Sequence, residues 1–183
     1  MRITTEQNDI DYVLFTEDQI RARIKEISAT LTEDYKEKNP IVVCILKGAS
    51  FFYVDLCREL RFPIFMDFIS VSSYGASAQS SGVVRIVKDM DKNITGRHVL
   101  IVEDIIDSGL TLKYLKELFA SRKPASIKTV CFLDKMDCHQ CEVKADYCGF
   151  SIPNRFVVGY GLDYSDFYRN LPYIGVLKPE VYA

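Results

Sequence analysis

The chain has 183 residues, of which 48% are hydrophobic and 26% charged, which is the size and balance of one ordinary globular domain. Its 23 basic and 25 acidic residues give a net charge of −2, which argues against a general nucleic-acid-binding surface. The longest apolar run, Ile41–Leu46, is too short to cross a membrane, and the first residues contain no apolar signal core. We therefore expect a cytoplasmic protein with reduced cysteines that binds neither nucleic acid nor a membrane.

Helix-like and strand-like segments alternate along the chain. Thr16 and Gln19 form a capping-box pattern, and apolar residues then recur at helical spacing as far as Tyr35. The apolar, partly β-branched run Ile41–Leu46 predicts a strand buried on both faces. Further helices are predicted over residues 49–60 and 110–121, and further strands over 64–71, 83–88, 98–102 and 127–133. This alternation predicts an α/β fold with a mostly parallel, twisted sheet flanked by helices.

Residues 72–82 differ from the rest, because they are small and polar and include two glycines. Such a segment buries too little apolar surface to be held in place by packing. We expect it to form a flexible lid, and the alternative is an ordinary hairpin loop.

Acidic and small residues follow the apolar run 99–102. Glu103 and Asp104 come first, Asp107 follows, and 108–111 opens a predicted helix. Ligands in open α/β sheets bind beyond the carboxyl ends of strands, and hydroxyls, a glycine and free N–H groups at a helix start can hold a phosphate. The three carboxylates would repel that phosphate. They therefore suit ribose hydroxyls, Mg²⁺ or a transferred proton, unless they only cap the helix.

The sequence VLIVEDIIDSGLT at residues 99–111 resembles the phosphoribosyl-pyrophosphate (PRPP) motif of the phosphoribosyltransferases. From about residue 41 onward, further segments resemble the hypoxanthine-guanine branch of that family, in the same order: Leu46-Lys47-Gly48, Ser73-Tyr74, Lys135, residues 152–160, Leu162-Asp163-Tyr164 and Arg169. The resemblance implies the type I phosphoribosyltransferase fold, with a small hood formed by the terminal segments. It implies one domain over 1–183, with a core at about 36–150 and the hood at about 1–15 and 151–183.

The implied activity is Mg²⁺-dependent purine salvage. The 5-phosphoribosyl group of PRPP would move to N9 of hypoxanthine or guanine, giving IMP or GMP and pyrophosphate through an oxocarbenium-like transition state. The implied partners are these small molecules and further copies of the chain in a homodimer or homotetramer.

The resemblance also assigns catalytic and metal-binding roles. Asp107 would be the general acid or base at purine N7. Glu103 and Asp104 would hold the ribose hydroxyls and face Mg²⁺, and Asp163 would be a further Mg²⁺ ligand. Ser73 and Tyr74 would act from the lid. The 5′-phosphate would be bound by Asp107, Ser108, Gly109, Leu110 and Thr111. Some family members have a lysine where this chain has Leu110, which leaves only the backbone to bind phosphate at that position.

Two further groups complete the implied site. Pyrophosphate would be bound by Lys47, Gly48 and Arg169, with a cis peptide before Lys47. The purine would be bound by Ile105, Lys135, Phe156, Val157 and Asp163. The Lys135 ammonium would donate to the 6-oxo group and disfavour the amino group of adenine. If the resemblance is set aside, the sequence instead favours Lys135 as a solvated lysine, Phe156 as a core residue and Arg169 as a partner of Asp166 on a surface turn.

Other functions fit less well. Cys138, His139, Cys141 and Cys148 resemble part of a zinc site, but a closed site requires four well-placed ligands, so exposed thiols are the simpler interpretation. A PRPP-binding regulator of RNA or DNA would need a basic face. A transferase for adenine or orotate disagrees with Lys135 and with residues 152–163.

Overall fold

The computed structural model of the protein describes residues 8–73 and 84–182. Its helices and strands, in chain order, are β1 (Ile10–Phe15), α2 (Glu17–Tyr35), β2 (Ile41–Leu46), α3 (Ser50–Glu59), β3 (Phe65–Ser73), β4 (Val84–Lys88), β5 (His98–Ile106), α4 (Leu110–Ser121), β6 (Ser126–Asp134), the 3₁₀ helix η1 (Met136–Cys138), β7 (Tyr147–Ser151), β8 (Val157–Val158), β9 (Ile174–Leu177) and α5 (Pro179–Tyr182).

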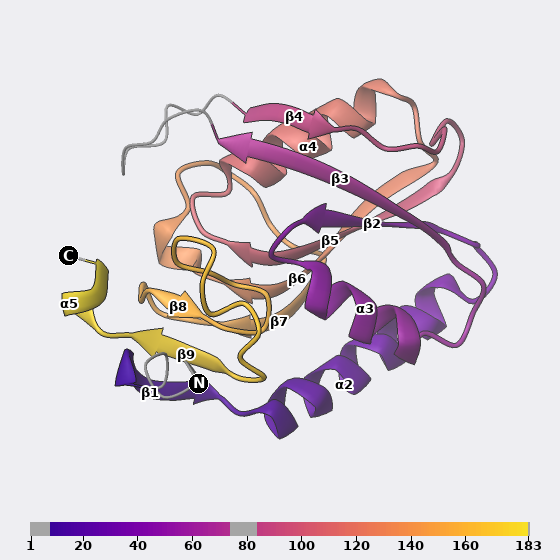
Figure 1. Ribbon diagram of the computed structural model, residues 1–183. Helices are drawn as coiled ribbons and strands as arrows, with labels where there is room; N and C mark the ends of the chain where they lie inside the picture. Colours follow the sequence, from indigo (N-terminus) through magenta and orange to yellow (C-terminus); the bar gives the residue numbers. More distant parts are fainter. Residues whose placement is uncertain (1–7, 74–83, 183) are drawn as a thin grey trace.

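A six-stranded sheet in the order β4-β3-β2-β5-β6-β7 forms the centre of the molecule. All neighbouring strands are parallel except β4, which lies antiparallel to β3 at the edge. The arrowheads of β2, β3, β5 and β6 therefore point to the same side of the molecule (Figure 1). The predicted α/β fold with a mostly parallel sheet is confirmed.

Helices cover both faces of this sheet. Residues of α2 and α3 pack with Val42 and Cys44 of β2 in one apolar cluster. Residues of α4 pack with Ile41, Val43 and Ile45 of the same strand in a second cluster. Because successive side chains of β2 enter different cores, the whole strand must be apolar, which is the pattern that the sequence shows.

A second, three-stranded sheet in the order β1-β9-β8 is antiparallel and joins the two ends of the chain. It forms the hood, and Phe15 of β1 stacks on Phe150 of β7 with ring centroids 3.9 Å apart, which links the hood to the central sheet. The hood lies on the side to which the parallel strands point (Figure 1). Among the described helices, none has the length and apolar content needed to span a membrane.

Two strands extend two or more residues past their predicted carboxyl ends. β5 continues four residues past the predicted end, because Glu103 and Ile105 still pair with Cys131 and Leu133 of β6. Glu103 and Asp104 thus lie within the strand and not in the loop after it. β3 extends to Ser73, inside the segment predicted as a lid, because its end pairs with β4. Tyr74 and the rest of the predicted lid up to residue 82 lie outside the described residues.

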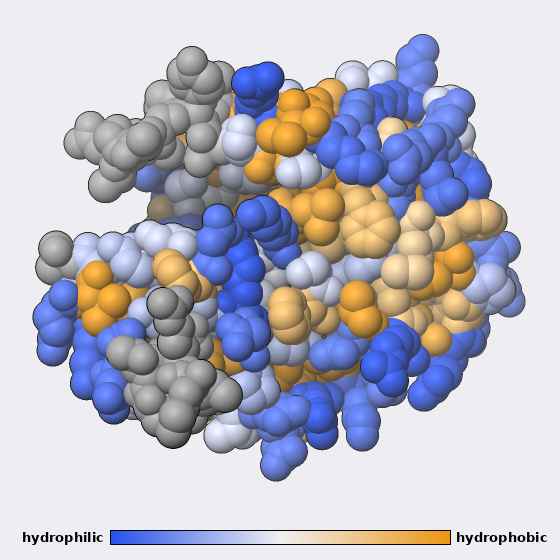
Figure 2. All heavy atoms as spheres, viewed as in Figure 1, coloured by the Kyte–Doolittle hydropathy of each residue, from blue (hydrophilic) through white to orange (hydrophobic). Residues whose placement is uncertain are grey.

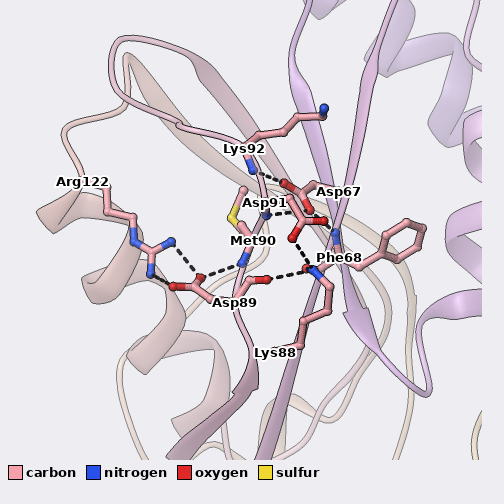
Figure 3. A network of polar contacts seen from close by, with 8 residues as sticks. All are labelled: Asp67, Phe68, Lys88, Asp89, Met90, Asp91, Lys92 and Arg122. Atoms are coloured by element: carbon pink, nitrogen blue, oxygen red, sulfur yellow. Dashed lines mark hydrogen bonds and ion pairs between the residues drawn. The ribbon is translucent and has the colours of Figure 1, made fainter.

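A polar network holds the base of the β3–β4 pair (Figure 3). The buried Asp67 carboxylate accepts hydrogen bonds from the N–H groups of Phe68, Asp91 and Lys92 at 2.8, 3.3 and 2.8 Å. Lys88 Nζ donates to the Phe68 carbonyl at 3.2 Å. These bonds fix the turn after β4 at the end of the sheet remote from the hood.

Candidate active site

Apart from Ser73 and Tyr74, the predicted site residues come from four separate segments that meet at the carboxyl edge of the central sheet. These segments are the loop after β2, the end of β5 with the start of α4, the residue after β6, and the 156–169 stretch of the hood. On the face shown in Figure 2, the surface is hollowed where the hood meets this edge.

The loop from β5 to α4 forms a small cradle. Gly109 has φ +79°, a left-handed conformation, and an added Cβ there would lie 2.4 Å from Val143 Cγ1. The Leu110 N–H makes a long hydrogen bond of 3.4 Å to Ser108 Oγ, and the N-cap residue Gly109 offers no side chain as a cap, so other N–H groups of the first turn of α4 remain available to an anion. Residues 105–109 and Thr111 line most of a cavity of about 90 Å³. The predicted helix over 110–121 is confirmed, and its start can bind a phosphate.

The cysteine-containing segment after η1 supports this cradle from behind. The Gln140 N–H donates to the Ser108 carbonyl oxygen at 2.9 Å, and Cys141 Sγ lies 3.8 Å from the same oxygen. The segment that suggested part of a zinc site from sequence thus packs against the predicted phosphate-binding loop.

Glu103 and Asp104 are two adjacent acids with few partners. Glu103 is buried, and its Oε2 accepts no hydrogen bond. Burial, and to a lesser degree Asp104, raises the pKa of Glu103 well above its usual value. Burial raises the pKa of Asp104 to about 6, although the Ile105 N–H and Arg169 act in the opposite direction. Both carboxyl groups are therefore stabilised by binding a proton or a cation.

Two glycines allow three segments to approach closely beside Asp104. An added Cβ on Gly48 would lie 1.6 Å from Asp104 Oδ2, and one on Gly161 would lie 2.1 Å from the Gly48 carbonyl oxygen. The Leu46–Lys47 peptide before this contact is cis, as the resemblance implies. The hood and the β2 loop thus meet through backbone atoms, and the backbone of the β2 loop lies against the Asp104 carboxylate of β5.

Lys135 and Asp107 form an ion pair across neighbouring strands. Lys135 Nζ lies 3.0 Å from Asp107 Oδ2, and the Lys135 side chain is buried while that of Asp107 is exposed. The Lys135 N–H also donates to the Ile106 carbonyl at 2.9 Å. The interpretation of Lys135 as a solvated lysine is wrong, because the parallel pairing of β5 with β6 places it beside the motif.

The predicted pyrophosphate-binding cations already have anionic partners. Lys47 Nζ lies 3.1 Å from Asp166 Oδ1. Arg169 Nη2 lies 3.1 Å from the same oxygen and 2.8 Å from Asp163 Oδ1. Arg169 and Lys47 hold the pKa of Asp166 below its usual value. The structure brings Lys47, Arg169 and Asp163 together, and it also contains the Arg169–Asp166 pair that was the alternative from sequence.

The remaining predicted purine-binding residues lie in the hood and in β5. Phe156 is partly buried between Tyr182, stacked at a centroid distance of 4.8 Å, and Tyr164, edge-on at 5.5 Å. Val157 is buried in β8, and Ile105 is partly buried in β5. Ser73 ends β3, whereas Tyr74 lies outside the described residues.

Two further observations concern metal ligands at the site and a larger cavity outside it. Within residues 8–73 and 84–182, no three His, Cys, Asp or Glu side chains are grouped to hold a metal ion, so Glu103, Asp104 and Asp163 do not form a preassembled cage. A larger cavity of about 600 Å³ lies between α2, α3 and the hood, and none of the predicted site residues lines it.

A family profile described as a phosphoribosyl transferase domain matches residues 14–165. The chain belongs to the phosphoribosyltransferase family. It is 53% identical over 176 residues to a hypoxanthine-guanine phosphoribosyltransferase of Bacillus subtilis, covering 96% of this chain and 98% of that protein. A Streptococcus pneumoniae enzyme of the same name is 53% identical over 177 residues, covering 97% and 98%. A crystal structure of a Staphylococcus aureus hypoxanthine phosphoribosyltransferase superposes with a TM-score of 0.95, 46% identity and full coverage of both chains.

Two residues beside the predicted site were missed from sequence, and Asp166 was named only as an alternative partner of Arg169. Gly161 lies against the Gly48 carbonyl, Asp134 Oδ1 lies 2.7 Å from His139 Nε2 beside Lys135, and Asp166 lies between two cations. The Gly159-Tyr160-Gly161 triplet could have marked a close backbone approach. The Asp134–His139 contact spans only five positions, whereas the contact of Asp166 with Lys47 joins residues 119 positions apart and depends on how distant segments meet.

Proposed function

We propose that the protein transfers the 5-phosphoribosyl group of PRPP to N9 of hypoxanthine or guanine and releases pyrophosphate. The observation that carries this proposal is the Lys135–Asp107 pair at the carboxyl edge of the sheet, next to the start of α4. In a 6-oxopurine, O6 accepts a hydrogen bond and the neighbouring N7 can carry a proton. An ammonium and a carboxylate side by side match these two atoms, whereas the amino group of adenine would face the ammonium with another donor.

In this proposal the base replaces the contact between the two side chains. Lys135 donates to O6, and Asp107 holds or accepts the proton at N7 as N9 attacks the ribose. Phe156, Val157 and Ile105 bind the purine ring, and Asp163 contributes to its binding from the hood. The exposure of Asp107 leaves room for the base to approach, while the burial of Lys135 fixes the ammonium in place.

The same loop would bind the ribose phosphate. The backbone N–H groups of residues 108–111 and the hydroxyls of Ser108 and Thr111 bind the 5′-phosphate at the start of α4. Glu103 and Asp104 hold the ribose hydroxyls. Burial raises the pKa values of both carboxyl groups, although Arg169 acts in the opposite direction on Asp104, and two carboxylates at this position would stabilise positive charge that develops on the ribose.

Enzymes of this family generally use Mg²⁺, and the acids present fit it. The buried, unpartnered Oε2 of Glu103 and the carboxylates of Asp104 and Asp163 are the oxygen donors that Mg²⁺ prefers. The ion commonly binds through few protein carboxylates together with substrate phosphates, which agrees with the lack of a preassembled cage among the described residues. When bound, Mg²⁺ neutralises the charge of the pyrophosphate group.

The deciding experiment is a steady-state assay with PRPP and hypoxanthine, guanine, xanthine or adenine, with and without Mg²⁺. The proposal expects Mg²⁺-dependent turnover of 6-oxopurines and none of adenine. Asp107→Asn should lower kcat by about 10²- to 10⁴-fold. Asp137→Asn, an exposed acid two residues after Lys135, is the control with the same charge change and should resemble wild type. PRPP binding without turnover of any base would instead indicate a regulator.

We also propose that copies of the chain associate as a homodimer or homotetramer in the cytoplasm. Phe51 and Val54 of α3 and Phe65 and Met66 of β3 are large apolar side chains that are exposed in the single chain. Figure 2 shows apolar side chains gathered over these two elements, which is typical of an interaction surface. All six cysteines are free, which suits a reducing compartment. Light scattering of the purified protein would measure the oligomeric state.

A further inference from the structure

The Asp166 carboxylate lies between the two cations that we assign to pyrophosphate. Its Oδ1 is 3.1 Å from Lys47 Nζ and 3.1 Å from Arg169 Nη2. The two cations come from opposite parts of the chain, since Lys47 precedes Asp166 by 119 positions. One carboxylate oxygen thus occupies a position between an ammonium and a guanidinium, which is the position that a phosphate oxygen would take.

The turn that contains Asp166 is held by contacts with the neighbouring site residues. The Asp166 N–H donates to Asp163 Oδ2 at 2.8 Å. Arg169 Nη1 donates to the Gly161 carbonyl at 2.7 Å, and Nη2 contacts Asp163 Oδ1 at 2.8 Å. Lys47, Arg169, Asp163 and Asp166 therefore form a set of two positive and two negative charges that neutralise one another.

We infer that Asp166 is an internal anion that competes with PRPP and pyrophosphate for Lys47 and Arg169 and is displaced when either ligand binds. The inference rests on the assignment of Lys47 and Arg169 to pyrophosphate in the proposed function. Asp166 competes with the pyrophosphate group for the same two cations. It therefore lowers the affinity for PRPP and for pyrophosphate, and it takes the cations back as pyrophosphate leaves.

The ion pairs of Asp166 with Lys47 and Arg169 can be broken at low cost in free energy. The side chains of Lys47 and Asp166 are 69% and 68% exposed, and exposed ion pairs contribute little free energy. Ser165, Asp166 and Tyr168 have φ values of +52°, +66° and +74°, a region that non-glycine residues seldom adopt. The ion pairs of Asp166 and the hydrogen bond to Asp163 together offset this unfavourable conformation. When an anion binds Lys47 and Arg169 in place of Asp166, the ion pairs are lost and the turn can relax.

The test is Asp166→Asn, because asparagine keeps the side-chain shape and tolerates a positive φ. Binding of inorganic pyrophosphate with Mg²⁺ is measured by calorimetry on the full-length protein. We expect about 2- to 10-fold tighter binding, corresponding to the loss of two exposed ion pairs. The gain should shrink at high salt, because screening weakens the competing pairs. Asp11→Asn, an exposed acid on β1, is the matched control and should leave pyrophosphate affinity unchanged.

A second variant and a double-mutant cycle complete the test. Asp166→Gly removes the carboxylate and suits the left-handed backbone, so it should show the same gain even if Asp166→Asn folds poorly. In a Lys47→Gln background the gain from Asp166→Asn should become smaller. Affinities equal to or weaker than that of Asp11→Asn in both Asp166 variants would overturn the inference. A folded wild-type protein that fails to bind pyrophosphate would overturn the proposed assignment of the cations first.

Discussion

Gly48→Ala tests whether the position of the Asp104 carboxylate matters for the chemistry. The added Cβ would lie 1.6 Å from Asp104 Oδ2 and 2.7 Å from its Cγ. Because non-bonded carbon atoms pack at about 3.5–4 Å, the carboxylate has to move by roughly 1–2 Å. Asp is a short side chain, so this movement requires a new χ1 or a shift of β5.

The effect on stability should be modest. A strained rotamer costs about 0.5–1.5 kcal/mol. The hydrogen bond from the Ile105 N–H to Asp104 Oδ1, now 2.8 Å, contributes a further ~0.5–1.5 kcal/mol. A carboxylate that moves toward water regains hydration, which offsets part of the loss. We therefore expect the free energy of unfolding to fall by about 1–2 kcal/mol, measured by urea denaturation.

The effect on activity should be much larger. A displacement of about 1 Å in a reacting group can lower the rate by ~10²-fold, so kcat/KM for PRPP should fall by about that factor. Gly96→Ala is the control, because Gly96 has φ +69° but nothing within 4 Å of the added Cβ, and it precedes β5 at the opposite edge of the sheet. It should lose ~1–2 kcal/mol of stability with wild-type activity. A folded Gly48→Ala protein with wild-type kcat/KM, or an equal activity loss in Gly96→Ala, would refute the reasoning.

Three further predictions concern single carboxylates and the buried lysine. Because the pKa of Asp104 is raised to about 6 by burial, the folded protein binds more protons than the unfolded chain between about pH 4 and 6, and the free energy of unfolding should fall as pH rises through that window. Asp104→Asn should remove about 2–3 kcal/mol of this dependence at most, measured by urea denaturation at pH 4 and 7.5, and a steeper pH dependence in the variant would be the contrary result. Lys135→Gln should lower kcat/KM for hypoxanthine by about 10- to 100-fold through loss of a charged hydrogen bond to O6, while the affinity for PRPP, measured by calorimetry, stays near wild type; equal losses for both would contradict the assignment to the base. Asp67→Asn leaves one or more of three backbone N–H groups poorly paired and should lower the free energy of unfolding by about 1–3 kcal/mol. The loss should appear as a lower melting temperature, and a melting temperature identical to wild type would show that the Asp67 charge is unimportant.

The local sequence determined most of the secondary structure. The Thr16–Gln19 capping box is present, with the Gln19 N–H donating to Thr16 Oγ1 at 3.3 Å, and α4 covers the predicted residues 110–121. The apolar run of β2 became the buried centre of the sheet. Each of these features depends on residues within a few positions of one another, such as a cap, a helical period or a continuous apolar run. Such patterns are legible without knowledge of the fold.

The tertiary structure decided where the chemistry is placed. Glu103 lies within β5 only because β6 continues to pair beside it, and Lys135 reaches Asp107 because these two strands are neighbours and parallel. Lys47 meets Asp166 only because the β2 loop and the hood approach through Gly48 and Gly161. Strand order and the packing of the hood bring together residues that are far apart in the chain. Contacts of this kind depend on the whole fold, so the sequence motif indicates which residues act, and the sheet and the hood decide which of them touch.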